Sequence, residues 1–167
     1  FIKNTLGSVT GIESRNELVQ NTKDLARELK FDRMSFINSE IADSKKLILK
    51  NVDTVTALHA CDTATDDAIR FGLDVKAKYM FLVPCCQAEI SRHLRTNKAE
   101  SLKKPLAELW RHGIHTVEMG SHLTNVLRCL LLESQGYKVT VTELVGWEHS
   151  MKNELIIAEY IGSKKGN

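Results

Sequence analysis

The sequence predicts an α/β fold, with a mostly parallel, doubly wound sheet and an antiparallel hairpin at its C-terminal end. Three observations lead to this prediction. Short apolar runs alternate with segments of helical periodicity through most of the chain, and neighbouring parallel strands need such crossover connections. Two of these runs stop abruptly at polar and thiol residues. The last two runs are joined directly by residues 146–153, which is typical of an antiparallel pair.

The first part of the chain alternates strand, helix and strand. Residues 8–13 and 34–38 are short β-like runs that end in polar residues. Residues 15–29 between them place apolar side chains at helical spacing, so we expect one face of this helix to be buried. Ser14 or Asn16 can cap its start. The expected apolar stripe is Leu18, Val19, Thr22, Leu25, Ala26 and Leu29.

The middle of the chain repeats this alternation. The run 52–60 is apolar enough for a central strand. A short helix over residues 65–71 follows, and we expect Gly72 to break it. The next strand, 78–83, ends where Pro84 denies a donor to the ladder.

The C-terminal part begins with a short helix over residues 87–94. Pro105 is suited to the first position of a further helix. The longest helix is expected over residues 115–134, with Gly136 as its left-handed C-cap. Its expected core face is Val117, Leu123, Val126, Leu127 and Leu130–Leu132. The last two strands are expected at residues 138–145 and 154–161.

Composition bounds the class of protein. The chain has 167 residues, of which 43% are hydrophobic and 26% charged, which is ordinary for one globular domain over residues 1–167. A net charge of +2 does not by itself imply a nucleic-acid partner. Four cysteines, with no apolar run long enough for a membrane span, predict a cytoplasmic protein with reduced thiols and no membrane partner. Because the chain begins at Phe1, we interpret it as a truncated domain.

Polar and thiol residues follow two neighbouring strands of the predicted sheet. One strand runs into residues 58–67 and the next into residues 82–87. In an open α/β sheet, ligands bind outside the carboxyl ends of the strands. We therefore predict a site along this rim. Its first candidate residues are His59, Cys61, Asp62, Pro84 and Cys86.

Three motifs in this order resemble a known family. They are His59-Ala60-Cys61-Asp62, Pro84-Cys85-Cys86 and the segment 148–153. The chain resembles the Rossmann-like, S-adenosylmethionine-dependent methyltransferases, in the branch whose neighbouring strands end in these motifs. Strand ends with Cys-Cys are also found in a tRNA ribose methyltransferase family. The resemblance covers residues 7–161 and implies a Rossmann-like fold, S-adenosylmethionine as cofactor and a methyl acceptor as substrate.

The resemblance assigns roles residue by residue. Glu13 matches the acid that binds the ribose hydroxyls, and a carboxylate can accept from two vicinal hydroxyls at once. Glu40 and Ile41 match the positions that face the adenine. The full set matched to the cofactor is Glu13, Glu40, Ile41, His59, Ala60 and Cys61. The set matched to the substrate pocket is Pro84, Cys85, Cys86, His149, Lys152 and Asn153.

One part of the family pattern is missing from these residues. No glycine-rich strand–loop–helix for the methionine part of the cofactor occurs in the sequence. The strand of that motif normally pairs with both the 8–13 strand and the 52–60 strand, so we expect the N-terminal strand of the sheet to be missing from this chain. A parallel sheet without it exposes strand edges. Self-association through such an edge is therefore a predicted partner interaction, and the chain alone is expected to bind the cofactor poorly.

Simpler interpretations remain open for each residue. Glu13 can complement the positive N-terminus of the following helix. His59 can be a hydrogen-bonded core histidine, and Cys85 and Cys86 can be small buried apolar residues. His59, Cys61, Cys85 and Cys86 contain the ligand types for zinc, but their spacing does not match a zinc knuckle, so we predict no metal. Asp62, Asp66 and Asp67 can also be first-turn acids that complement the dipole of a helix.

The predicted reaction is the transfer of a methyl group to a nucleophile, for which a base is needed where the nucleophile is protonated. His59 is the first candidate for the base and Asp62 the second. RNA is the leading acceptor, with protein and small molecules as alternatives. The alternative function is a non-catalytic methyltransferase-like module that binds RNA or a protein. A dehydrogenase or a hydrolase is disfavoured because the dinucleotide fingerprint and the nucleophile elbow are both absent from the sequence.

Overall fold

The computed structural model describes residues 7–46, 51–58, 60, 63–84, 89–96, 111–146 and 153–162. The chain forms two compact units, Phe1–Ile48 and Leu49–Asn167, and each is described by itself. The expectation of a single domain over residues 1–167 stays a prediction. Within the described residues, no helix is long and apolar enough to cross a membrane.

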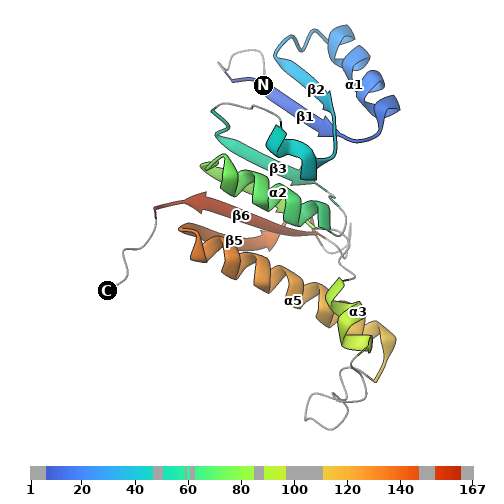
Figure 1. The fold of residues 1–167 in the computed structure, drawn as a ribbon, viewed down its shortest axis with the longest axis vertical. Helices are drawn as coiled ribbons and strands as arrows, with labels where there is room; N and C mark the ends of the chain where they lie inside the picture. The colour runs from blue at the N-terminus through green and yellow to red at the C-terminus, as the bar shows by residue number, and fades with distance from the viewer. Residues whose placement is uncertain are drawn as a thin grey trace. The chain divides into compact units, whose positions relative to one another are not determined.

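The first unit is a parallel strand pair with a crossover helix (Figure 1). Strand β1 (Val9–Glu13) pairs with β2 (Met34–Asn38), and helix α1 (Asn16–Glu28) connects them. Helix η2 (Ile41–Lys46) follows β2. The register places Glu13 opposite Asn38 at the carboxyl end of the pair. These boundaries confirm the predicted strand–helix–strand order.

The second unit is a four-stranded sheet in the order β3-β4-β6-β5. Its strands are β3 (Thr54–Leu58), β4 (Tyr79–Val83), β5 (Tyr137–Glu143) and β6 (Glu154–Tyr160). Its helices are α2 (Thr63–Asp74), α3 (Glu89–Thr96) and α5 (Gly113–Ser134). The pair β3–β4 is parallel, and β6 is antiparallel to both β4 and β5. The α/β class and the antiparallel C-terminal hairpin are thus confirmed. Among the described strands, none pairs with both β1 and β3.

The core of the second unit lies between the sheet and its helices. Alternate residues of β3, β4 and β6 point to the buried face, because side chains alternate along a strand. The fully buried members include Met80, Leu82, Ile156 and Ala158. Helix α2 adds Ala68 and Ile69 to this core, and α5 adds Leu132.

Three predictions about helices are wrong. Gly72 does not break α2, which continues to Asp74. Gly72 is buried and packs against the Met80 side chain. In α1 only Val19 and Ala26 of the expected stripe are buried, and Leu25 and Leu29 are exposed. In α5 most of the expected core face points to solvent, as described below. The C-terminal end of α5 is as predicted, since Gly136 follows the cap residue with φ of +88°.

Candidate functional site

The carboxyl end of the β1–β2 pair is held by a single amide side chain. Asn38 Nδ2 donates to the carbonyl oxygens of Glu13 at 3.1 Å and Ser14 at 2.8 Å. The backbone N–H of Ser39 donates to the same Glu13 carbonyl at 3.2 Å. These bonds satisfy backbone acceptors that the parallel ladder leaves unpaired at its end. The backbone of the turn from β1 into α1 is therefore fixed, and the Glu13 side chain lies beside the start of α1.

The Glu13 carboxylate accepts three hydrogen bonds from Arg15. The backbone N–H and Nε of Arg15 both donate to Oε1 at 3.0 Å, and Nη2 donates to Oε2 at 3.1 Å. These bonds, with the side-chain contact first, lower the pKa of Glu13 to about 2, and partial desolvation opposes them. The carboxylate is therefore ionised at neutral pH. Because two carboxylate oxygens offer about four acceptor directions, one direction on Oε2 is not used by Arg15.

This geometry bears on both interpretations of Glu13. The contact from the backbone N–H of Arg15, which is the N-cap residue of α1 and makes no side-chain cap of its own, fits an acid that complements a helix start. Ser14 and Asn16 are thus not the cap. An exposed edge also remains, since 35% of the Glu13 side chain is accessible. An ionised, one-third-exposed carboxylate at a strand end has the chemistry required to accept hydrogen bonds from the hydroxyls of a ribose.

Glu40 and Ile41 follow β2 directly. The Glu40 carbonyl accepts from Ser39 Oγ and from the Asp43 N–H, both at 3.1 Å, which fixes the backbone at this point. The Glu40 side chain is exposed, and Ile41 is half-buried at the start of η2. One polar and one apolar side chain thus stand side by side after the strand. Their predicted contact with an adenine stays a prediction.

The described part of the predicted rim in the second unit includes Leu58, Ala60 and Pro84. Leu58 ends β3 and is 60% exposed. The carbonyl of Ala60 accepts from Oγ1 of the buried Thr65 at 2.6 Å, which ties the strand end to the first turn of α2. Pro84 is buried directly after β4. The other predicted rim residues, His59, Cys61, Asp62, Cys85 and Cys86, lie outside the described residues.

The C-terminal hairpin is described through Asn153. This side chain is buried, its Nδ2 donates to the Val145 carbonyl, and its own carbonyl accepts from the Leu144 N–H at 2.7 Å. Asn153 therefore links the end of β5 to the start of β6 by hydrogen bonds. His149 and Lys152 lie outside the described residues, and the substrate role predicted for all three stays a prediction.

In the described part of the chain, no group of three or more His, Cys, Asp or Glu residues is placed to hold a metal ion. The residues weighed for zinc, His59, Cys61, Cys85 and Cys86, are not among those described.

Sequence reasoning missed two polar residues that the structure makes central. Asn38 ends β2 opposite Glu13. A polar amide at the end of a strand is the feature of the sequence that could have indicated its role. Asp66 was interpreted as a helix-dipole acid, but it accepts a two-pronged contact from Arg128 on α5, with Nε–Oδ1 of 2.8 Å and Nη2–Oδ2 of 2.7 Å. No local pattern connects two residues so far apart in the chain. The bidentate pair joins α2 to α5.

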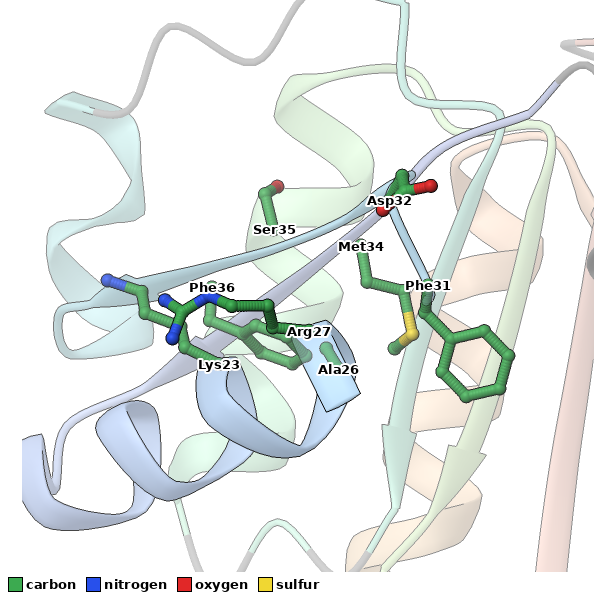
Figure 2. A pocket seen from close by; sticks show the side chains of 8 residues that line it. All are labelled: Lys23, Ala26, Arg27, Phe31, Asp32, Met34, Ser35 and Phe36. Carbon is green, nitrogen blue, oxygen red and sulfur yellow. The ribbon is translucent and has the colours of Figure 1, made fainter. Parts of the chain in front are cut away.

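A pocket of about 330 Å³ lies in the first unit between α1 and β2, as Figure 2 shows. Its polar rim includes Lys23 and Arg27, and Arg27 also pairs with Asp24 at 2.9 Å. The pocket uses the amino half of β2, whereas Glu13 and Asn38 stand at the carboxyl end. It is therefore separate from the predicted cofactor end. Its apolar members are Ala26, Phe31, Met34 and Phe36.

Comparisons with known proteins agree with this fold. A family model described as "Methyltransferase domain" matches residues 1–93. No curated protein sequence matches the chain. A putative rRNA methylase from Clostridium thermocellum is similar in structure, with a TM-score of 0.59 and 13% identity over 95% of this chain and 75% of that one. An rRNA methylase from Streptococcus thermophilus has a TM-score of 0.57 and 9% identity, over 93% of this chain and 74% of that one.

A third similar structure is an SAH-bound methyltransferase from Podospora anserina. Its TM-score is 0.54 and its identity 11%, over 96% of this chain and 63% of that one. At these identities the structural similarity concerns the fold, and the family match covers the strand end that carries Glu13 and the predicted His59 rim. The Rossmann-like prediction is confirmed.

Proposed function

The chain belongs to the methyltransferase-domain family, and from this premise we propose that it binds S-adenosylmethionine and transfers its methyl group to RNA. The observation that carries the cofactor assignment is the ionised carboxylate of Glu13 at the carboxyl end of β1. It lies within the matched residues, and it follows a strand and precedes a helix, as ribose-binding acids do in Rossmann-like folds.

The residues in the first unit fit the nucleoside part of this cofactor. Glu13 can accept hydrogen bonds from ribose hydroxyls. Asn38 fixes the backbone of the turn that carries Glu13. Ile41 offers a half-buried apolar side chain for a base, next to the exposed Glu40. The cofactor, when bound, supplies an activated methyl group on a sulfonium. Ala60, His59 and Cys61 remain the proposed contacts from the second unit, by resemblance.

The acceptor is proposed from two supports. Two of the similar structures are described as an rRNA methylase and a putative rRNA methylase, and the chain has a modest positive charge of +2. His59 is the proposed base, with Asp62 second, and Pro84, Cys85 and Cys86 are proposed to line the acceptor pocket. A cytoplasmic location belongs to this proposal, as does self-association through a sheet edge.

Binding of S-adenosylmethionine by calorimetry tests the cofactor assignment. A charged hydrogen bond contributes about 1.5–3 kcal/mol, so Glu13→Gln should weaken binding at least about tenfold. The matched control is Glu17→Gln, because Glu17 is an acid in the first turn of the same helix. If Glu13 only complements the helix start, Glu13→Gln will lower the melting temperature and leave the affinity unchanged.

Two further arms sharpen this test. Arg15→Ala removes the side-chain donors on Glu13, so affinity should stay equal or rise. The pKa of Glu13 is lowered from 4.5 to about 2, so any stability from its ionised form is present above about pH 4.5 and is lost as pH falls through 2. Affinity should therefore be flat from about pH 5 to 8 as far as Glu13 is concerned.

Transfer of a labelled methyl group to ribosomal and transfer RNA tests the acceptor. Label in RNA that is lost with His59→Ala, measured at a cofactor concentration that saturates the variant, supports transfer with His59 as base. Cofactor binding without transfer to any RNA would favour the alternative, a methyltransferase-like module that binds RNA or a protein without catalysis.

A further inference from the structure

The loop between β3 and α2 is closed by a buried hydroxyl. Thr65 is 1% exposed, and its Oγ1 donates to the carbonyl oxygen of Ala60 at 2.6 Å. Strand β3 ends at Leu58 and α2 begins at Thr63, so the loop consists of residues 59–62. The proposed cofactor contacts from the second unit and both candidates for the base belong to these residues. The Thr65 hydroxyl therefore acts on the segment on which the proposed function depends.

The hydrogen bond from Thr65 fixes a backbone group that the sheet does not hold. Ala60 is half-buried and follows the last residue of β3, so its carbonyl is not part of the ladder between β3 and β4. Because a peptide group is planar and trans, a hydrogen bond to its oxygen sets the orientation of the whole group. The donor is buried, and a hydrogen bond shielded from water is electrostatically stronger than an exposed one. The peptide group that begins at the Ala60 carbonyl is therefore held in one orientation.

The first turn of α2, which carries Thr65, is itself firmly held. The next residue, Asp66, accepts two hydrogen bonds from the guanidinium of Arg128 on α5. Ala68 and Ile69, in the following turn, are fully buried in the core. Because breaking a buried ion pair is strongly unfavourable, this turn cannot shift without a large loss of stability. Thr65 is therefore a fixed point from which the Ala60 carbonyl can be positioned.

A purely structural role for Thr65 is the simpler alternative, since a buried hydroxyl needs an acceptor wherever it lies. Within a helix, threonine commonly donates to the carbonyl four residues earlier. Thr116 of α5 does this: it is also 1% exposed, and its Oγ1 donates to the His112 carbonyl at 3.2 Å. Thr65 instead donates to a carbonyl five residues earlier, in the loop that precedes its helix. Its hydroxyl thus holds the loop rather than a turn of α2.

We propose that Thr65 is a positioning residue for the cofactor, and that its hydroxyl sets the Ala60 peptide group in the orientation in which the loop 59–62 contacts S-adenosylmethionine. Because Ala60 is a cofactor contact only within the proposed function, this role of Thr65 rests on that function. At 1% exposed, Thr65 is too buried to touch the cofactor itself. Without the hydroxyl, the Ala60 carbonyl pairs with water and its peptide group can turn. Binding must then reorder the loop, which lowers the affinity.

Calorimetric binding of S-adenosylmethionine to the whole chain, well below its melting temperature, tests this role. Thr65→Val replaces the hydroxyl by a methyl group of similar size and should weaken binding about fivefold, as expected for one lost hydrogen bond. The matched control is Thr116→Val, which removes an equally buried hydroxyl near the start of α5. Both variants should lower the melting temperature, and only Thr65→Val should lower the affinity.

A second pair of variants isolates the hydroxyl and does not depend on how valine packs. Thr65→Ser keeps the oxygen and Thr65→Ala removes it, while both lack the methyl group. Thr65→Ser should bind within about twofold of the parent chain, and Thr65→Ala about fivefold more weakly.

The outcomes separate this role from the proposed function. A parent chain that binds no S-adenosylmethionine overturns the proposed function, and the role of Thr65 with it. A parent chain that binds the cofactor, with Thr65→Ala binding as tightly as Thr65→Ser, overturns only the role of Thr65. Equal weakening by Thr116→Val and Thr65→Val also overturns it, because the loss of affinity would then follow stability and not the loop.

Discussion

Helices α2 and α5 lie next to each other in the same unit, yet they differ in whether their apolar side chains are buried or exposed to solvent. In α2 the buried residues are mainly apolar or small and include Ala68, Ile69 and Phe71. In α5 the buried residues include Asn125 and Arg128, while six large apolar side chains are exposed, namely Ile114, Val117, Val126, Leu127, Leu130 and Leu131. Hydrophobic periodicity orients a helix only when no buried polar contact demands another orientation.

The difference arises from one ion pair. Asp66 is on α2 and Arg128 is on α5, and their two-pronged contact fixes the facing sides of both helices. Helix α5 has leucines at three consecutive positions, Leu130 to Leu132, which point in three directions around the helix. Such a run gives no single apolar face. The Asp66–Arg128 pair therefore sets the orientation of α5, and in this orientation Leu132 is the leucine that is fully buried.

The largest expected effect separates two leucines of this run. Leu132→Ala removes a fully buried side chain and should lower the free energy of unfolding by about 3 kcal/mol. Leu130→Ala removes a side chain that is 54% exposed and should cost below about 1 kcal/mol. Urea unfolding of dilute protein, where dimers do not contribute, measures both. Equal losses would contradict the assignment of the buried face.

The next effect concerns the ion pair. Asp66→Asn leaves the guanidinium of Arg128 buried without its counter-charge, and breaking a buried pair in this way costs about 3–5 kcal/mol. Because the Asp66 side chain is 42% exposed, water can reach the site, and we expect about 2 kcal/mol. The control is Asp67→Asn on the same helix turn, whose contact with Arg70 is longer, at 3.5 Å, and whose partner Arg70 is 62% exposed. This control should change the free energy of unfolding by less than about 0.5 kcal/mol.

A smaller effect is expected where α5 meets α3. A Cβ at Gly120 would lie 2.8 Å from Ser91 Cβ and 2.9 Å from the Ser91 backbone nitrogen. Since backbone cannot move aside as a side chain can, Gly120→Ala should destabilise by about 1–2 kcal/mol, even after the gain in helix propensity. Thermal unfolding measures this, and a variant more stable than the parent would show that α3 is not packed closely on α5.

The sequence predicted the order and nature of the elements better than their faces. Short apolar runs bounded by polar residues identified all described strands, because strand formation depends on local composition and period. The strand end at Glu13 was found in the same way. The Asn38 contacts and the Asp66–Arg128 pair were missed because both depend on residues that only the fold brings together. Because the Asp66–Arg128 pair was missed, the buried face of α5 was predicted wrongly.

The smallest expected effect is at Gly72, where the sequence suggested a helix break and the structure shows a close contact. A Cβ at this position would lie 2.7 Å from Met80 Sδ and 2.9 Å from Met80 Cε. These atoms are the far end of a flexible side chain that adapts readily. Relieving the close contact with an added Cβ therefore costs less free energy at Gly72 than at Gly120. Alanine also favours the helix by about 1 kcal/mol over glycine. The two terms oppose each other, and Gly72→Ala should change the free energy of unfolding by less than about 1 kcal/mol. A loss as large as that of Gly120→Ala would mean that the α2 contact with β4 is as rigid as the backbone contact between α5 and α3.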